Sequence, residues 1–339
     1  MKPRALVDPY PRTMALLFGR EELRRLKALV TPVTWEGSRM PAEMVDRHLP
    51  ATTVLIGQTA LPREQLERAE QLKAIINVEG NFQPTVDYDT CFQRGIHVLG
   101  VGNAFGAAVA EMALGLALAL ARGIPEGDRL FRRGKEVYGR FSNQEAFLLS
   151  GADVGFIGFG SLGRALLPLL EPFRCRIRVY DPRLPARWLA GQGMLPCSLD
   201  VLLAASQVVF VLAGATEENR AMLDRRRLDR MPTGACLVLV SRASLVDFGA
   251  LAAKLARGEI RAAVDVFPEE PCPKKHPIRR QEHVILSAHR AGGLPAVYRL
   301  MGEMIVEDVT QILNGLPPVR LQRAERETVG RLRSMPVKK

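Results

Sequence analysis

A glycine-rich turn between two apolar segments constrains the fold of this chain more than any other feature. The run from Val154 to Ile157 enters a G-x-G-x-x-G sequence, which leaves as an apolar, helix-like segment from Arg164 to Leu170. The turn itself reads Gly158-Phe159-Gly160-Ser161-Leu162-Gly163. Glycines let the backbone turn tightly from strand to helix and approach a pyrophosphate, whose charge then lies at the helix N-terminus. The stretch predicts a dinucleotide-binding site.

An acidic residue follows this turn at the spacing that a ribose contact requires. The segment from Arg176 to Tyr180 has the pattern of a second strand, and it ends in Asp181, roughly 20 residues after Gly158. A carboxylate here would accept hydrogen bonds from a ribose diol and repel a 2′-phosphate, so NAD is expected in preference to NADP. Arg183 and Arg187 lie close downstream and leave NADP open. A tight turn without a ligand is the alternative interpretation.

Length and charge set broad limits on the class of protein. At 339 residues the chain is longer than one hydrophobic core usually serves, so two domains are expected. Its net charge of +11 is compatible with nucleic acid or with small anions as ligands. The basic clusters at 129–135, at 225–230 and from Arg320 lack the interleaved aromatic residues of single-strand binders. A solvated basic surface is therefore the preferred interpretation, and nucleic-acid binding is not expected.

Cysteine usage and apolar runs point to a reducing, aqueous compartment. The five cysteines are widely spaced and form no C-x-x-C pair, so neither a disulfide framework nor a metal site is indicated. The N-terminus lacks the apolar core of a signal peptide. The longest apolar stretch, Ala104 to Ala121, is interrupted by Glu111, and we expect a buried helix there and no membrane span. A cytoplasmic location is expected.

The order of the predicted elements indicates an α/β protein. Short apolar runs alternate with amphipathic ones through the first hundred residues, which predicts parallel strands joined by helices, the first strand at either Ala5 to Val7 or Met14 to Phe18. Gly100 to Gly106 is interpreted as a hinge, and a second α/β series follows it. A helix is predicted from Pro295 to Leu313. The basic residues 321–339 are expected to form a flexible tail.

Three polar residues follow predicted strands of the second series. Arg242, Glu270 and His289 each come after an apolar run, at the carboxyl ends where ligands bind in open α/β sheets. A guanidinium can hold a carboxylate in bidentate fashion, and an imidazole oriented by a carboxylate can give or take a proton. Together they predict a hydride-transfer site. Taken singly, each has a structural alternative: a helix-start contact, a surface acid and a core histidine, respectively.

Four motifs in one order resemble those of the D-isomer-specific 2-hydroxyacid dehydrogenases. In chain order they are Gly158-Phe159-Gly160-Ser161-Leu162-Gly163 with Tyr180-Asp181-Pro182, Ser241-Arg242 with Leu245-Val246-Asp247, Asp265-Val266-Phe267-Pro268-Glu269-Glu270-Pro271, and Ser287-Ala288-His289-Arg290-Ala291-Gly292-Gly293. The resemblance covers roughly residues 74 to 316. It implies a Rossmann-like NAD-binding domain, residues 104–294, and a smaller flavodoxin-like substrate domain that is discontinuous, residues 1–103 with 295–320.

The resemblance also assigns roles to single residues. Arg242 would bind the substrate carboxylate and carbonyl, His289 would act as acid and base, and Glu270 would orient His289. The residues implied to contact the cofactor are Gly158, Gly160, Ser161, Leu162, Gly163, Asp181, Ala213, Ser241, Asp265 and His289. Backbone at Gly80 and Asn81 would help Arg242 to bind the substrate. The implied activity is the NAD(H)-dependent interconversion of a 2-oxo acid and a D-2-hydroxy acid.

Two segments depart from the family pattern. Where relatives usually carry a glycine-rich turn, this chain reads Val78-Glu79-Gly80-Asn81-Phe82, which puts an acid and a large aromatic near the expected carboxylate site. Where relatives often read His-x-Pro-Leu-Thr beside the cofactor, this chain reads Val211-Leu212-Ala213-Gly214-Ala215-Thr216. We therefore expect an altered substrate and a reshaped cofactor wall.

Two other functions share this fold and motif order. One is a dinucleotide-sensing scaffold that resembles the C-terminal binding protein corepressors, and the other is the oxidation of a small one-carbon or inorganic anion. The catalytic set of residues does not separate these from the 2-hydroxyacid enzyme, which is the preferred interpretation. A homodimer is also expected, because the segment from Ala104 to Ala121 is apolar almost all round. Burial of that helix wholly inside the monomer is the alternative.

Overall fold

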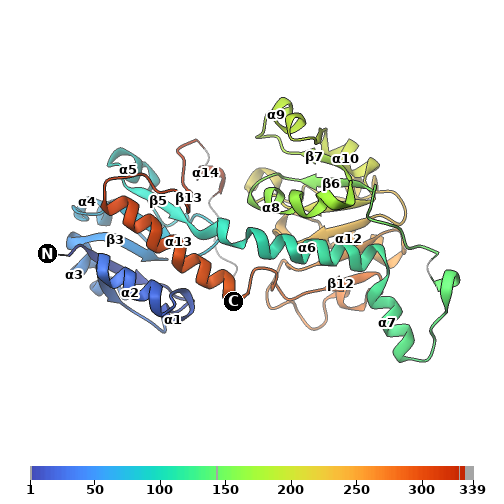
Figure 1. Cartoon of the computed structure of the whole chain (residues 1–339), viewed down its shortest axis with the longest axis horizontal. Helices are drawn as coiled ribbons and strands as arrows, with labels where there is room; N and C mark the ends of the chain where they lie inside the picture. The colour runs from blue at the N-terminus through green and yellow to red at the C-terminus, as the bar shows by residue number, and fades with distance from the viewer. Residues whose placement is uncertain (1, 143, 328, 333–339) are drawn as a thin grey trace. The chain divides into compact units, whose positions relative to one another are not determined.

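The chain folds into two compact α/β units, each with its own sheet of mainly parallel strands (Figure 1). The computed structural model describes residues 2–142, 144–327 and 329–332. Within these residues, the first unit comprises 2–105 and 293–332, and the second comprises 106–292. The expectation of an α/β fold is confirmed.

The first unit is built on a six-stranded sheet in the order β13-β5-β4-β3-β1-β2. Its strands are β1 (Arg4–Asp8), β2 (Thr31–Thr34), β3 (Thr52–Gly57), β4 (Ala74–Asn77), β5 (His97–Gly100) and β13 (Gln322–Arg323). Its helices are α1 (Met14–Leu17), α2 (Arg20–Leu29), α3 (Ala42–His48), α4 (Arg63–Arg68), α5 (Tyr88–Gln93), α13 (Pro295–Leu313) and α14 (Val329–Leu332). Of the two segments proposed for the first strand, Ala5–Val7 lies in β1 and Met14–Leu17 is helical.

Helices cover both faces of this sheet. All six residues of β3 are buried, as expected for a central strand rich in β-branched residues. One apolar cluster joins Leu55 and Ile75 of the sheet to Leu66 of α4 and Cys91 of α5. Helix α13 packs with α1 and α2, and a Cβ added at Gly302 would lie 2.1 Å from the carbonyl oxygen of Leu17. The glycine therefore allows the close approach of α13 to α1.

The expectation of a flexible tail from residue 321 is wrong for the residues that the structure describes. Strand β13 pairs antiparallel with β5, with Gln322 opposite Gly100 and Arg323 opposite Leu99. The carboxylate of Asp308, which is fully buried on α13, accepts hydrogen bonds from the backbone N–H groups of residues 319–321. A sheet edge and a buried carboxylate thus satisfy the backbone of a segment whose composition indicates disorder. Residues 333–339 lie outside the described residues.

The second unit is a doubly wound parallel sheet in the order β12-β11-β10-β9-β6-β7-β8. Its strands are β6 (Asp153–Ile157), β7 (Arg176–Tyr180), β8 (Leu195–Pro196), β9 (Val208–Val211), β10 (Cys236–Leu239), β11 (Arg261–Val264) and β12 (Val284–Leu286). Its helices are α6 (Gly106–Ala121), α7 (Ile124–Arg132), α8 (Ser161–Leu170), α9 (Ala186–Gly191), α10 (Leu199–Ala205), α11 (Arg225–Leu228) and α12 (Phe248–Ala256). The strand order reverses between β6 and β9, and ligands of such sheets bind at this switch point.

Helix α6 belongs to the core of the second unit. It packs on α8 and on strands β10 and β11, while α10, α11 and α12 contribute to the apolar cluster on the other face. The continuous segment Val101–Ala121 is long and apolar enough to cross a membrane by length and composition alone. Of its most apolar window, 56% is buried within the fold, as in the core helix of a globular unit. Most of the apolar surface of α6 is therefore used inside the chain.

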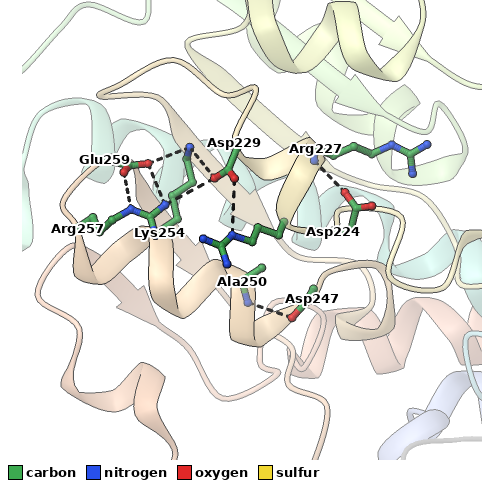
Figure 2. Close-up of polar contacts among 9 residues, drawn as sticks. Asp224, Arg227, Asp229, Asp247, Ala250, Lys254, Arg257 and Glu259 are labelled. Atoms are coloured by element: carbon green, nitrogen blue, oxygen red, sulfur yellow. Dashed lines mark hydrogen bonds and ion pairs between the residues drawn. The ribbon is translucent and has the colours of Figure 1, made fainter.

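An ion-pair network joins the end of α12 to the end of α11 (Figure 2). Lys254, whose side chain is only 4% exposed, places its Nζ 3.2 Å from Glu259 Oε2 and 3.7 Å from Asp229 Oδ1. Arg257 Nε donates to Glu259 Oε1 at 2.5 Å. These hydrogen bonds, that of Arg257 above all, hold the pKa of Glu259 at about 2. The ionised carboxylate is therefore favoured by the folded state.

Glu259→Gln should lower the midpoint of thermal unfolding at neutral pH, because the amide pairs less strongly with two cations. A carboxylate whose pKa is lowered by folding stabilises the fold fully at pH values above its unfolded pKa, near 4.5. That contribution is lost as the pH falls towards about 2. The difference between variant and unaltered protein should thus be constant from pH 7 to 5 and shrink below pH 4.5. Thermal melts across pH measure it, with the exposed Glu282→Gln as control. A difference independent of pH would contradict the assignment.

Candidate active site

The glycine-rich turn adopts the conformation that its sequence predicts. Gly158 follows β6 with φ of +90°, and a Cβ placed there would lie 2.7 Å from the Cα of Ala213, which follows β9. Gly160 is the N-terminal cap of α8, and a Cβ there would meet no atom within 4 Å. Gly158 is therefore required by close backbone packing. The open side of Gly160 and the start of α8 suit a pyrophosphate.

Asp181 is held at the end of β7 by backbone donors. Its Oδ2 accepts from the N–H of Phe159, inside the glycine-rich turn, at 2.8 Å, and its Oδ1 accepts from the N–H of Arg183 at 3.0 Å. The carboxylate is half-buried and fixed beside the turn, where it can accept from a ribose. Arg183 and Arg187 are exposed.

A hollow of about 250 Å³ adjoins Asp181, and the sequence interpretation did not include the residues that line it from the α9 and β8 regions. The lining residues include Leu184 and Leu189 from the α9 region and Pro196 and Cys197 from the β8 region. An apolar slot beside a ribose-binding carboxylate suits a flat nucleoside base. The two-residue strand β8 carries no motif, so sequence reasoning had no pattern by which to find this wall.

Ser241 supplies a second observation that fits a polar cofactor. The residue follows β10 and is 2% exposed, and within the described part of the chain its buried Oγ has no hydrogen-bond partner. A buried hydroxyl without a partner costs free energy unless a ligand satisfies it. The residues at the carboxyl ends of β6, β7, β9 and β10 thus fit a dinucleotide.

His289 and Glu270 form a hydrogen-bonded pair. The Nδ1 of His289 lies 2.6 Å from Oε2 of Glu270, whose other oxygen accepts from the N–H of Phe267 at 2.9 Å. A carboxylate only accepts here, so Nδ1 carries the proton and Nε2 is the atom that can exchange a proton with a ligand. The His289 side chain is 40% exposed and hence accessible.

Asp265 fixes the backbone that carries His289. Its carbonyl oxygen accepts from the N–H of His289 at 2.7 Å, and its carboxylate, 1% exposed, accepts from the N–H groups of Arg290 and Ala291. His289 itself has φ of +49°, a left-handed conformation that is rare outside glycine. Such strain persists only where surrounding contacts enforce it, and it clusters at functional sites. The resemblance implies a cofactor contact for Asp265, and the structure shows it bracing the histidine loop.

Arg242 lies at the end of β10, and its Nη1 donates to the carbonyl oxygen of Ser241 at 2.8 Å. Strands β10, β11 and β12 are neighbours in the sheet, so Arg242, Glu270 and His289 follow three adjacent parallel strands. The structure brings Glu270 and His289 into direct contact and places Arg242 at the same edge.

Gly80 and Asn81 lie in the first unit, in the turn after β4. The side chain of Asn77 braces this turn at both ends, because its Oδ1 accepts from the N–H of Glu79 at 2.7 Å and its Nδ2 donates to the carbonyl oxygen of Asn81 at 2.7 Å. The aromatic that was expected near the carboxylate site, Phe82, is 3% exposed and packs in the core of the unit. Of the two unusual side chains, Glu79 alone remains at the turn.

The fold and the glycine-rich turn define a dinucleotide-binding α/β protein, in which His289 pairs with Glu270 at the same edge of the sheet. The sequence profile of the D-isomer specific 2-hydroxyacid dehydrogenase, NAD binding domain, matches residues 114–291. The chain therefore belongs to the D-isomer-specific 2-hydroxyacid dehydrogenase family, as its motifs indicated, and its second unit is an NAD(P)-binding domain.

Named relatives agree with this assignment. The chain is 30% identical over 269 residues to a glyoxylate reductase from Thermofilum pendens, covering 77% of this chain and 78% of the relative. It is 30% identical over 259 residues to a D-3-phosphoglycerate dehydrogenase from Methanocaldococcus jannaschii, covering 76% of this chain and 48% of the relative. The chain thus spans about half the length of the phosphoglycerate dehydrogenases that it matches.

A solved structure resembles the whole chain. A phosphoglycerate oxidoreductase from Rhizobium etli has a TM-score of 0.87 and 43% sequence identity, with 97% of this chain and 100% of that chain covered. The similarity includes the first unit, which the family profile does not reach.

Proposed function

We propose that the protein is an NAD(H)-dependent oxidoreductase that interconverts a 2-oxo acid and a D-2-hydroxy acid. The observation that carries this proposal is the 2.6 Å contact between His289 and Glu270 at the end of β12, in the same unit as the glycine-rich turn. A histidine in a strained, braced conformation with a carboxylate partner is the arrangement that general acid–base catalysis needs.

Each residue of the site has its own role in the proposed reaction. A nicotinamide cofactor held at the glycine-rich turn would supply the hydride for reduction of a 2-oxo acid and accept it in the reverse direction. During reduction, His289 Nε2 donates the proton to the carbonyl oxygen, and during oxidation it removes that proton. Glu270 fixes the imidazole and stabilises its charged form. Arg242 binds the carboxylate. Backbone at Gly80 and Asn81, in the first unit, is also proposed to bind the substrate.

A panel of 2-oxo acids with NADH and with NADPH tests the proposal, with nicotinamide absorbance as the readout. The relatives are named for glyoxylate and D-3-phosphoglycerate, so the panel should run from glyoxylate to phosphorylated three-carbon acids. At least one acid should be reduced. The second candidate, a dinucleotide-sensing scaffold like the C-terminal binding protein corepressors, would bind NADH and turn over none of them.

NAD should be preferred over NADP, because the Asp181 carboxylate faces the ribose position beside the turn. Asp181→Ser should weaken NADH more than NADPH and so relax the preference. Calorimetric titration of both cofactors into both proteins measures this, and Asp200→Ser, at an acid outside the cofactor site, is the control. If the unaltered protein already binds NADPH tenfold more tightly, about 1.4 kcal/mol, the nearby arginines dominate and the argument from Asp181 is wrong.

We also propose that the protein is a cytoplasmic homodimer. Its interface would lie on a different surface from the helix at 104–121 that was first expected to form it. Large apolar side chains are exposed on α7 and in the segment after it, which extend from the sheet of their unit (Figure 1). They include Ile124 (58% exposed), Phe131 (62%), Tyr138 (75%), Phe141 (62%) and Leu148 (68%). Such a patch marks an interaction surface.

Light scattering at micromolar concentration should give twice the chain mass. The double variant Phe131→Asp with Phe141→Asp should halve the measured mass. A monomer mass for the unaltered protein would contradict the proposed dimer.

A further inference from the structure

A partly buried ion pair lies at the turn to which we assign substrate binding. Arg12, in the loop between β1 and α1, places its Nη1 2.9 Å from Oε1 of Glu79 and donates to the carbonyl oxygen of Val78. The two side chains are only 11% and 20% exposed. The guanidinium also lies over the ring of Tyr298 on α13, with Cζ 5.5 Å from the ring centre. Three segments far apart in the sequence thus meet at this arginine.

The position of Glu79 creates an electrostatic problem for a substrate that carries a carboxylate. Its N–H is bonded to Asn77, and Gly80, whose backbone is proposed to bind the substrate, is the next residue. A second carboxylate brought to this turn would meet a fixed like charge, and partly buried charges are weakly screened by salt. An unpaired Glu79 would therefore act against the ligand that the proposed function requires.

The contacts of Arg12 show how the chain resolves this conflict. Its guanidinium neutralises Glu79, and its bond to the Val78 carbonyl ties that charge to the turn itself. Within the described residues its buried Nε has no hydrogen-bond partner, so the placement of the side chain leaves one donor unsatisfied. Keeping a buried donor unpaired costs free energy, which indicates that Arg12 is placed for Glu79 and Val78 and not for its own hydrogen bonding.

We propose that Arg12 is a specificity-determining residue that acts through Glu79. By cancelling the charge of Glu79 it makes the turn at 78–82 acceptable to the carboxylate of a small 2-oxo acid. The inference rests on the proposed function, and it adds a residue that lies 67 positions before Glu79 and belongs to none of the family motifs. The pair sets affinity for the anionic substrate and takes no part in proton or hydride transfer.

Variants that remove the charge of Arg12 or of Glu79 should change KM in opposite directions. Arg12→Met should raise KM for an accepted 2-oxo acid about 10- to 100-fold and change kcat only a few-fold. Glu79→Gln should lower KM several-fold, because it leaves the cation in place without its acid. The double variant should return to within about threefold of the unaltered protein. Arg12→Lys, which keeps the charge but not the planar fork, should stay within about tenfold. Arg39→Met, at an exposed arginine that stacks on Tyr10 in the same unit, is the control.

A binding measurement separates this inference from the proposed function. Oxamate, an uncharged-amide analogue of a 2-oxo acid that retains the carboxylate, is titrated calorimetrically into the NADH-loaded proteins, and its Kd should follow the same order as KM. If no 2-oxo acid is turned over while oxamate binding still follows the charge at 12 and 79, the proposed function fails and the inference stands. Weaker binding in Glu79→Gln, no rescue in the double variant, or no oxamate binding by the unaltered protein would overturn the inference. If Arg12→Met does not fold, the direction of the change in KM and Kd in Glu79→Gln, compared with Arg12→Lys, tests the inference.

Discussion

His289→Ala should lower turnover of an accepted 2-oxo acid by about 10²-fold or more, the usual scale of general acid–base catalysis. The variant retains the hydride donor and the carboxylate contacts but removes the group that gives a proton to the developing alkoxide. Binding of NADH should change little, because the glycine-rich turn and Asp181 lie on other strands. Steady-state rates and a cofactor titration on the same preparation measure both effects.

The pH dependence identifies the proton donor. In the unaltered protein, reduction consumes a proton and oxidation of the hydroxy acid releases one, so the rate of reduction should fall and the rate of oxidation should rise as pH rises. Both limbs should vanish in His289→Ala. His283→Ala, at a histidine before β12, is the matched control and should behave as the unaltered protein.

Gly158→Ala should weaken NADH binding by about 10²-fold. A left-handed backbone costs an L residue about 1–2 kcal/mol, and the crowding of a Cβ 2.7 Å from the Ala213 backbone adds about 1–3 kcal/mol. The turn can relieve both only by shifting, which moves the groups that contact the pyrophosphate. At about 1.4 kcal/mol for each tenfold, the sum of about 2–5 kcal/mol corresponds to roughly 1.5 to 3.5 powers of ten, and 10² lies within that range.

Calorimetric titration of NADH measures this effect, and Gly191→Ala serves as its control. Gly191 ends α9 without a positive φ, and a Cβ there would meet nothing within 4 Å. Its alanine variant should bind NADH as the unaltered protein does. Unchanged affinity in Gly158→Ala would show that the turn is not the pyrophosphate site.

Most of the fold could be predicted because the sequence patterns of its strands and helices lie within the elements themselves. Parallel strands buried on both faces give uninterrupted apolar runs, and helix α13 begins and ends at the predicted residues, Pro295 and Leu313, where a proline and an Asn-Gly pair bound it. Strand β2 was not found, because Thr31–Thr34 is an edge strand with half-exposed or exposed residues and an internal proline. The segment Met14–Leu17 is short and apolar, and periodicity cannot separate helix from strand at that length.

The candidate site also contains some residues that could be predicted from the sequence and others that could not. Residues that follow strands, such as Asp181 and His289, could be placed from spacing, because parallel strands bring their carboxyl ends to one edge. The bracing of His289 by Asp265 and the pairing of Arg12 with Glu79 could not, since each joins backbone or side chains that meet only after folding. The order of residues 321–323 could not be predicted for the same reason, because their partners are a sheet edge and Asp308 on another element.

The most direct test of the account is the configuration of the product. A 2-oxo acid of three or more carbons that the protein accepts is reduced with excess NADH, and the hydroxy acid formed is resolved by chiral chromatography. The account predicts the D isomer, formed in amounts equal to the NADH oxidised, and its loss in His289→Ala. The L isomer, or no product from a protein shown by titration to be loaded with NADH, would contradict it.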